Sequence, residues 1–153
     1  MRMRGWVIVA AAAAAGFGLA GCPSSSCPKE SPQVNAGGIP TSCTAAAGQP
    51  VTYPVRICPT CNQSSATCVV DMSAAATSGD IFLDTKVETC SGSGSCSQGC
   101  QASPISCTFT APAASATPYM VTVFDGGSGT TLTSQLTVTQ GGPASCALSA
   151  AGI

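Results

Sequence analysis

The chain has 153 residues, of which 5 are Lys or Arg, 6 are Asp or Glu and none is His. This small, nearly balanced charge argues against a nucleic-acid-binding surface, and the absence of imidazole excludes catalysts that need it. The 44% hydrophobic content overstates the core, because 24 of these residues are Ala and 11 are Cys. After Gly21, only 21 of 132 residues are Val, Ile, Leu or Phe, too few for an ordinary core. The composition therefore predicts a small core that disulfides hold together.

The first predicted element is an export signal. Arg2 and Arg4 precede an uninterrupted apolar run over residues 6–20. A charged start, a short apolar stretch and small residues at its end are the parts of a signal segment. The run is shorter than the roughly 20 residues that a stable membrane-spanning helix needs.

The end of this run, Leu19-Ala20-Gly21-Cys22, resembles the lipobox of bacterial lipoproteins. In these proteins the Cys thiol receives a diacylglyceryl group, with acyl chains such as palmitate, and cleavage makes this Cys the first residue. The resemblance implies a signal peptide over residues 1–21 and lipidation of Cys22. Pro23 stands where many such lipoproteins carry an inner-membrane retention Asp, which favours the outer membrane. The alternatives are an ordinary secretory signal with a coincidental Cys and a retained membrane helix.

Residues 22–49 follow this signal and are rich in Pro, Ser, Gly and Ala. Such a composition predicts a tether without a core of its own, although Cys27 and Cys43 could attach parts of it to the body. The expected organisation is a signal peptide over residues 1–21, a lipidated tether over 22–49 and a disulfide-rich β-domain over 50–153.

Beyond Pro50, short runs of alternating apolar residues are separated by Gly, Ser and Pro. The alternation predicts strands near residues 51–57, 81–88, 105–109, 119–123 and 132–138, a weaker one near 68–70, and a seventh if 144–148 also pairs. The clearest would bury Ile81, Leu83, Thr85 and Val87, opposite Phe82, Asp84, Lys86 and Glu88. Residues 73–76 could form at most one helical turn. Six or seven short strands predict a small antiparallel β-sandwich.

The last predicted hairpin resembles a known one. Residues 118–125, the Gly-rich turn and residues 136–139 resemble the final hairpin of bacterial immunoglobulin-like modules, including the polycystic-kidney-disease type. The resemblance implies an immunoglobulin-like sandwich in which Tyr119 begins the penultimate strand and its hydroxyl group bonds back to the preceding corner. The Cys-rich middle departs from that pattern and leaves the sheet topology open.

Ten cysteines follow Cys22, and an even number in an exported chain predicts up to five disulfides. They are Cys27, Cys43, Cys58, Cys61, Cys68, Cys90, Cys96, Cys100, Cys107 and Cys146. The sequence alone does not choose their pairing. Each bond would contribute roughly 2–4 kcal/mol and so offset the small core.

Two other uses of these thiols are open. Cys58 and Cys61 match the Cys-x-x-Cys pattern of thioredoxin-like oxidoreductases, but that chemistry needs a helix N-terminus at the first Cys, and the polar residues 62–65 begin a helix poorly. A zinc site could use Cys58 and Cys61 with Cys96 and Cys100 as four thiolates, but an oxidising compartment favours disulfides. The sequence favours structural disulfides over both of these uses.

The remaining polar and aromatic residues mark no active site. The acids Asp71, Asp80, Asp84, Glu88 and Asp125 include no marked pair. Asp84 and Glu88 alternate around Lys86, which predicts a solvated strand face, and Asp125 opens a Gly-rich turn that offers Ca²⁺ one carboxylate where several oxygens are needed. No Ser has a His to activate it. Most of the five aromatic residues of the predicted domain are expected in the core, and the Thr-rich residues 130–133 on an exposed strand face.

The sequence as a whole therefore predicts a non-enzymatic, lipid-anchored envelope protein without catalytic residues, metal or cofactor. It would act as a structural or interaction module that meets the membrane through its anchor. A second partner would be an envelope protein or a polysaccharide, and nucleic acid is not expected. The alternative is a redox or metal-handling envelope protein that uses Cys58 and Cys61 with Cys96 and Cys100.

Overall fold

The computed structural model describes residues 27–91 and 100–148 of the chain, so the predicted signal peptide, Cys22 and Cys96 lie outside the described residues. The described part is all-β and contains no helix. Its strands are β1 (Lys29–Glu30), β2 (Gln33–Val34), β3 (Ser42–Ala46), β4 (Pro50–Cys58), β5 (Gln63–Asp71), β6 (Asp80–Thr89), β7 (Ser103–Thr110), β8 (Tyr119–Asp125), β9 (Thr130–Thr139) and β10 (Ser145–Cys146).

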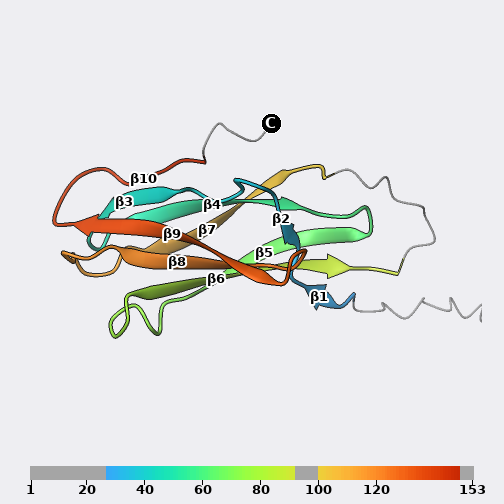
Figure 1. Ribbon diagram of the computed structural model, residues 1–153, viewed down its shortest axis with the longest axis horizontal. Helices are drawn as coiled ribbons and strands as arrows, with labels where there is room; N and C mark the ends of the chain where they lie inside the picture. Colours follow the sequence, from blue (N-terminus) through green and yellow to red (C-terminus); the bar gives the residue numbers. More distant parts are fainter. Residues whose placement is uncertain (1–26, 92–99, 149–153) are drawn as a thin grey trace, which may run out of the picture.

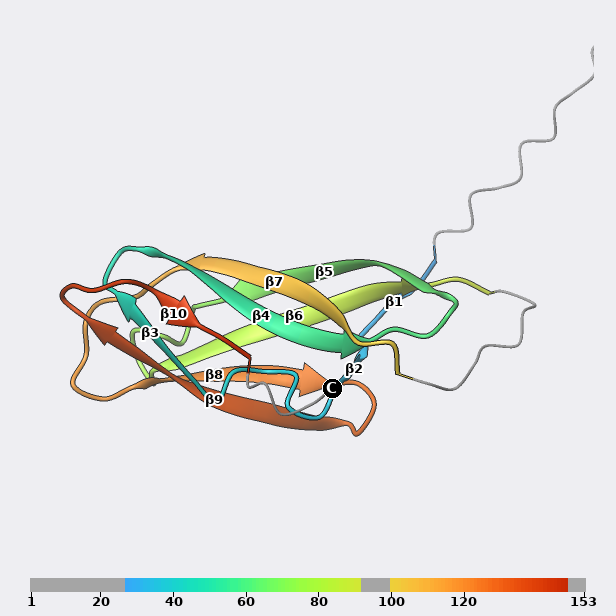
Figure 2. The ribbon, with the colours of Figure 1, turned by 90° about the horizontal axis from the view of Figure 1, so that it is seen from above.

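These strands form two sheets that lie face to face in an elongated body (Figure 1). The larger sheet has seven strands in the order β1-β6-β8-β9-β3-β10, with β5 also paired to β6, and the smaller sheet has the order β2-β4-β7. Figure 2 shows β4 and β7 on one side of the body and β8 and β9 on the other. Every strand predicted from the apolar alternation is present, including the weaker β5 and the short β10.

The prediction of a purely antiparallel sandwich is wrong, because the larger sheet is mixed. β6 pairs with β8 in parallel, and β3 pairs with β9 in parallel. β7 lies between β6 and β8 in the chain but belongs to the smaller sheet. The chain therefore crosses from the larger sheet to the smaller one and returns, and β8 reaches the edge of β6 in the same direction.

The stretch expected to be a tether contributes three strands from residue 29 onward. β1 pairs with β6, β2 with β4, and β3 with β9. Cys43 and Ala45 of β3 are only 1% and 2% exposed. Residues 29–46 are therefore part of the packed domain, which begins well before the expected boundary at residue 50.

The core fills the space between the two sheets. Its largest fully buried side chains include Tyr53 and Ile57 from the smaller sheet and Ile81, Leu83 and Leu136 from the larger one. The alternation predicted for β6 is confirmed, since its four inward residues are at most 2% exposed. Burial of these apolar side chains supplies the main favourable free energy of folding.

Two polar side chains are buried in the core, one with a hydrogen-bond partner and one without. The Tyr53 hydroxyl group lies 2.6 Å from Ser134 Oγ and so links the two sheets. Burial raises the pKa of the Tyr53 phenol, against the smaller opposing effect of this hydrogen bond. Thr85, which is 1% exposed, has a buried hydroxyl oxygen without a hydrogen-bond partner in the described part of the chain.

The last hairpin has the geometry that the sequence predicts. β8 and β9 are antiparallel neighbours joined by the turn after Asp125. The Tyr119 hydroxyl group, at the start of β8, donates a hydrogen bond to the carbonyl oxygen of Ala113 at 2.8 Å. The predicted contact of this tyrosine with the preceding corner is confirmed.

Candidate functional site

Nine of the ten cysteines predicted to form disulfides are in the described residues, and all nine are disulfide-bonded. Four pairs are Cys27–Cys90, Cys43–Cys146, Cys58–Cys100 and Cys68–Cys107. The bonds join segments separated by 39 to 103 residues. Because such bonds constrain the unfolded chain, they suit a domain with few large apolar residues.

Cys58 and Cys61 do not bond to each other, because Cys58 pairs with Cys100. Cys61 lies within a turn, in which the Gln63 amide donates a hydrogen bond to the Thr60 carbonyl oxygen at 3.0 Å, and β5 follows. No helix N-terminus is present to lower a thiol pKa there. The disulfide also removes Cys58 and Cys100 from the predicted four-thiolate zinc site. In residues 27–91 and 100–148, no group of three or more potential metal-ligating side chains comes together.

The outer face of the larger sheet, which points away from the smaller sheet, carries the large apolar side chains that remain exposed. Four of them, which we call the apolar patch, are Val69, Phe82, Met120 and Phe124, with exposed fractions of 61%, 43%, 38% and 41%. Tyr53, Phe109 and Tyr119 are buried as expected, whereas Phe82 and Phe124 are not. Contiguous exposed apolar side chains often mark an interaction site.

The register of the strands places these four side chains next to one another. Phe82 of β6 is paired with Thr122 of β8, and Met120 and Phe124 lie two residues to either side of Thr122. Side chains two residues apart share one face of a strand, so Met120 and Phe124 flank Phe82 diagonally. Val69 lies two residues from the β5 partner of Phe82. The patch therefore spans β5, β6 and β8 and is centred on Phe82.

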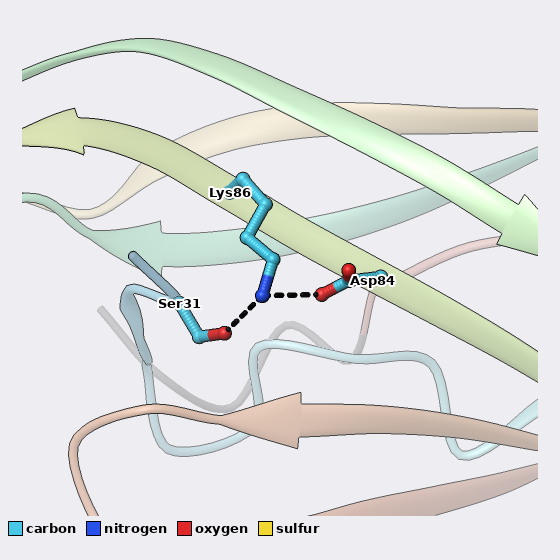
Figure 3. Close-up of polar contacts among 3 residues, drawn as sticks. All are labelled: Ser31, Asp84 and Lys86. Atoms are coloured by element: carbon cyan, nitrogen blue, oxygen red, sulfur yellow. Dashed lines mark hydrogen bonds and ion pairs between the residues drawn. The ribbon is translucent and has the colours of Figure 1, made fainter. Parts of the chain in front are cut away.

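A polar network continues the same face toward β1. Figure 3 shows Lys86 between two partners, with its Nζ 3.0 Å from an Asp84 carboxylate oxygen and 3.0 Å from Ser31 Oγ. The Asp84 and Lys86 side chains are 53% and 33% exposed. An ion pair this exposed contributes little to stability, and the predicted solvated face is confirmed.

Asp125 is a structural residue in the β8–β9 turn. Its Oδ1 accepts hydrogen bonds from the Val34 amide at 2.8 Å and the Gly127 amide at 3.0 Å, and its Oδ2 accepts one from Ser128 Oγ at 2.6 Å. Burial alone would raise the pKa of Asp125, but these hydrogen bonds outweigh it and hold the pKa below its usual value. The carboxylate thus fastens β2 to the turn, and its oxygens are already satisfied by protein donors.

A polar hollow of about 270 Å³ lies between residues 75–79 and residues 115–119. Its hydroxyl groups bond within the protein: Ser78 Oγ donates to Asp80, and Ser115 Oγ lies 3.1 Å from Thr117 Oγ1. These internal bonds leave the hollow without converging free groups, and we assign it no role.

Val69 and Met120 do not stand out in the sequence as members of a site. The alternation that buries Tyr119, Val121 and Val123 also turns Met120 outward, so the pattern contained that signal. Their convergence with Phe82 depends on the strand order, which the sequence left open.

No protein-family model, curated protein or solved structure matches this chain. Among the described residues, no helix is long and apolar enough to span a membrane.

Proposed function

We propose that this protein is a non-enzymatic, lipid-anchored envelope protein that binds a partner through the outer face of its larger sheet. The apolar patch is the observation that supports this function. The strand register places three exposed large apolar side chains around the exposed Phe82, and exposing them to water is unfavourable unless a partner covers them.

The proposed domain is an immunoglobulin-like β-sandwich. Three features support this assignment: the hydrogen bond of Tyr119 to the preceding corner, the Cys68–Cys107 disulfide between strands of the two sheets, and the final β8–β9 hairpin. The tyrosine corner and an inter-sheet disulfide both occur in immunoglobulin-like domains.

Lipidation of Cys22 would hold the domain close to the membrane. Cys27 is bonded to Cys90 at the end of β6, so only residues 22–26 would separate the lipid from the packed body. Five residues span at most about 17 Å. Phe82 is eight residues from Cys90, about 26 Å along an extended strand, and Figure 1 places β1 at one end of the body. The apolar patch would thus lie on the part of the domain that is remote from the anchor.

Site-specific photocrosslinking in the native bacterium tests this function. A photoreactive residue placed at Phe82 or Phe124 is expected to give a discrete crosslinked species. The matched control is Thr108, an exposed residue of β7 in the smaller sheet, which is expected to give none. No crosslink at either patch position, or the same species from Thr108, would contradict the assignment of this face.

A further inference from the structure

We infer that the partner covering the apolar patch is a basic polypeptide segment that presents cationic side chains around an apolar one. This inference rests on the proposed function, because it specifies the chemistry of the partner that the outer face would bind.

Three carboxylates surround Phe82 on the outer face. Asp80 and Asp84 lie two residues to either side of it on β6, and Asp71 is its direct partner on β5. Side chains of paired residues lie on the same face of a sheet, about 5 Å apart. The centre of the patch is therefore apolar and its immediate border is acidic.

Two of these carboxylates accept hydrogen bonds from neighbouring serine residues. The Asp71 carboxylate accepts a hydrogen bond from the Ser73 amide at 2.8 Å, and this bond, with a further one from the Ser73 side chain, lowers its pKa. Ser78 Oγ donates to Asp80. Asp71 and Asp84 are exposed at the surface, where an incoming cation can reach their carboxylates.

Little positive charge compensates this border. Within the described residues, Lys86 is the nearest cation along β6, and it is already paired with Asp84 at 3.0 Å. Lys29 of β1 lies opposite Glu88 in the strand register, at the far end of β6 from the patch, and Arg56 belongs to β4 in the other sheet.

The opposite border of the patch is neutral. β9, which pairs with β8, contains no charged residue over Thr130–Thr139. The field at the patch is therefore negative on its β5–β6 side only. A partner with cations beside its apolar anchor would gain from both features, since complementary charge fixes orientation and speeds association. An anionic lipid surface would be repelled by the same carboxylates, which disfavours the membrane as the occupant.

Binding of two designed peptides to the full-length protein in phosphatidylcholine nanodiscs tests the inference. The peptides share their apolar residues and carry either Lys or Glu at every polar position, and fluorescence anisotropy gives their affinities. We expect the Lys peptide to bind at least tenfold more tightly than the Glu peptide. Its affinity should fall at least tenfold in Phe82→Ser and severalfold in the Asp71→Asn/Asp84→Asn double variant.

Glu30→Gln provides the matched control, because it removes one carboxylate on β1, away from the patch, and should leave the affinity unchanged. Far-ultraviolet circular dichroism of each variant verifies that it is folded, and Phe82→Leu should retain most of the binding. Equal binding of the two peptides, an equal loss in Glu30→Gln, or binding only to a neutral glucan or to anionic vesicles would overturn the inference. If crosslinking at Phe82 nevertheless succeeds, the proposed function stands and only the chemistry assigned to the partner is wrong.

Discussion

Removal of the Cys68–Cys107 disulfide is expected to destabilise the domain more than removal of Cys27–Cys90. The first bond joins β5 of the larger sheet to β7 of the smaller one, and Cys107 is fully buried in the core. The second bond fastens the N-terminal end of the described body beside the last residue of β6. In each of the two variants, both cysteines of the pair are replaced by Ala.

The expected loss in the free energy of unfolding has two parts, the entropy of loop closure and the burial of the cysteine side chains. For a separation of 39 residues, the chain-entropy relation gives a loss of about 4 kcal/mol in the free energy of unfolding. The separation of 63 residues for Cys27–Cys90 gives a slightly larger entropic loss, also about 4 kcal/mol. Loss of the buried sulfur at Cys107 adds roughly 1 kcal/mol of packing. Since domains of this kind are stable by about 5–15 kcal/mol, either variant should be strongly affected.

Urea unfolding without reductant, followed by circular dichroism, measures both losses. We expect the Cys68→Ala/Cys107→Ala variant to unfold at the lower urea concentration. A loss below about 1 kcal/mol for this pair, or a clearly larger loss for Cys27→Ala/Cys90→Ala, would refute the reasoning that a buried inter-sheet bond supports the core.

Three further substitutions test local features of the fold by urea unfolding. Thr85→Val removes an unpartnered buried hydroxyl group and should raise the free energy of unfolding by about 1 kcal/mol; a decrease would mean that the hydroxyl group is satisfied. Gly126→Ala would place a Cβ 1.9 Å from the Ser31 carbonyl oxygen and should cost roughly 1–3 kcal/mol, whereas Gly141→Ala, with open space around it, should be nearly neutral. Asp125→Asn should cost roughly 1–3 kcal/mol at pH 7. Because the folded pKa of Asp125 is lowered, its contribution is present above its unfolded value near 4 and is lost as the pH falls through the folded pKa; a difference from Asn that stays constant down to pH 2 would contradict this role.

The fold could be predicted from the sequence where local pattern decides the structure. The alternation in β4 and β6 to β9 records one buried and one exposed face, and the strands formed there. β1 and β2 contain only two residues each, too few to show a period. β3 depends on Cys43 and Ala45 for its inward face, and Ala has little preference for strands. The parallel pairs could not be predicted, because the β6–β8 pair depends on the sheet that β7 joins and the β3–β9 pair on the sheet that β3 joins.

In the candidate site too, some features follow from the local sequence pattern and others depend on contacts between distant segments. The outward position of Phe82 follows from the pattern of β6, and the even number of cysteines anticipates the disulfides. The neighbours of Phe82 and the partner of Cys58 depend on strand order and on contacts between distant segments, which local sequence does not encode. The sequence therefore left the pairing of Cys58 open, and the structure bonds it to Cys100 across 42 residues.

We propose that a lipid at Cys22 anchors this domain, and under this proposal both the location of the domain and the orientation of the apolar patch follow from the anchor. Mass spectrometry of the N-terminal peptide of the protein purified from its native membrane detects the lipid. We expect a chain that begins at Cys22 and carries the mass of a diacylglyceryl group on that residue. A chain that keeps residues 1–21, or one that is cleaved but carries an unmodified Cys22, would contradict it.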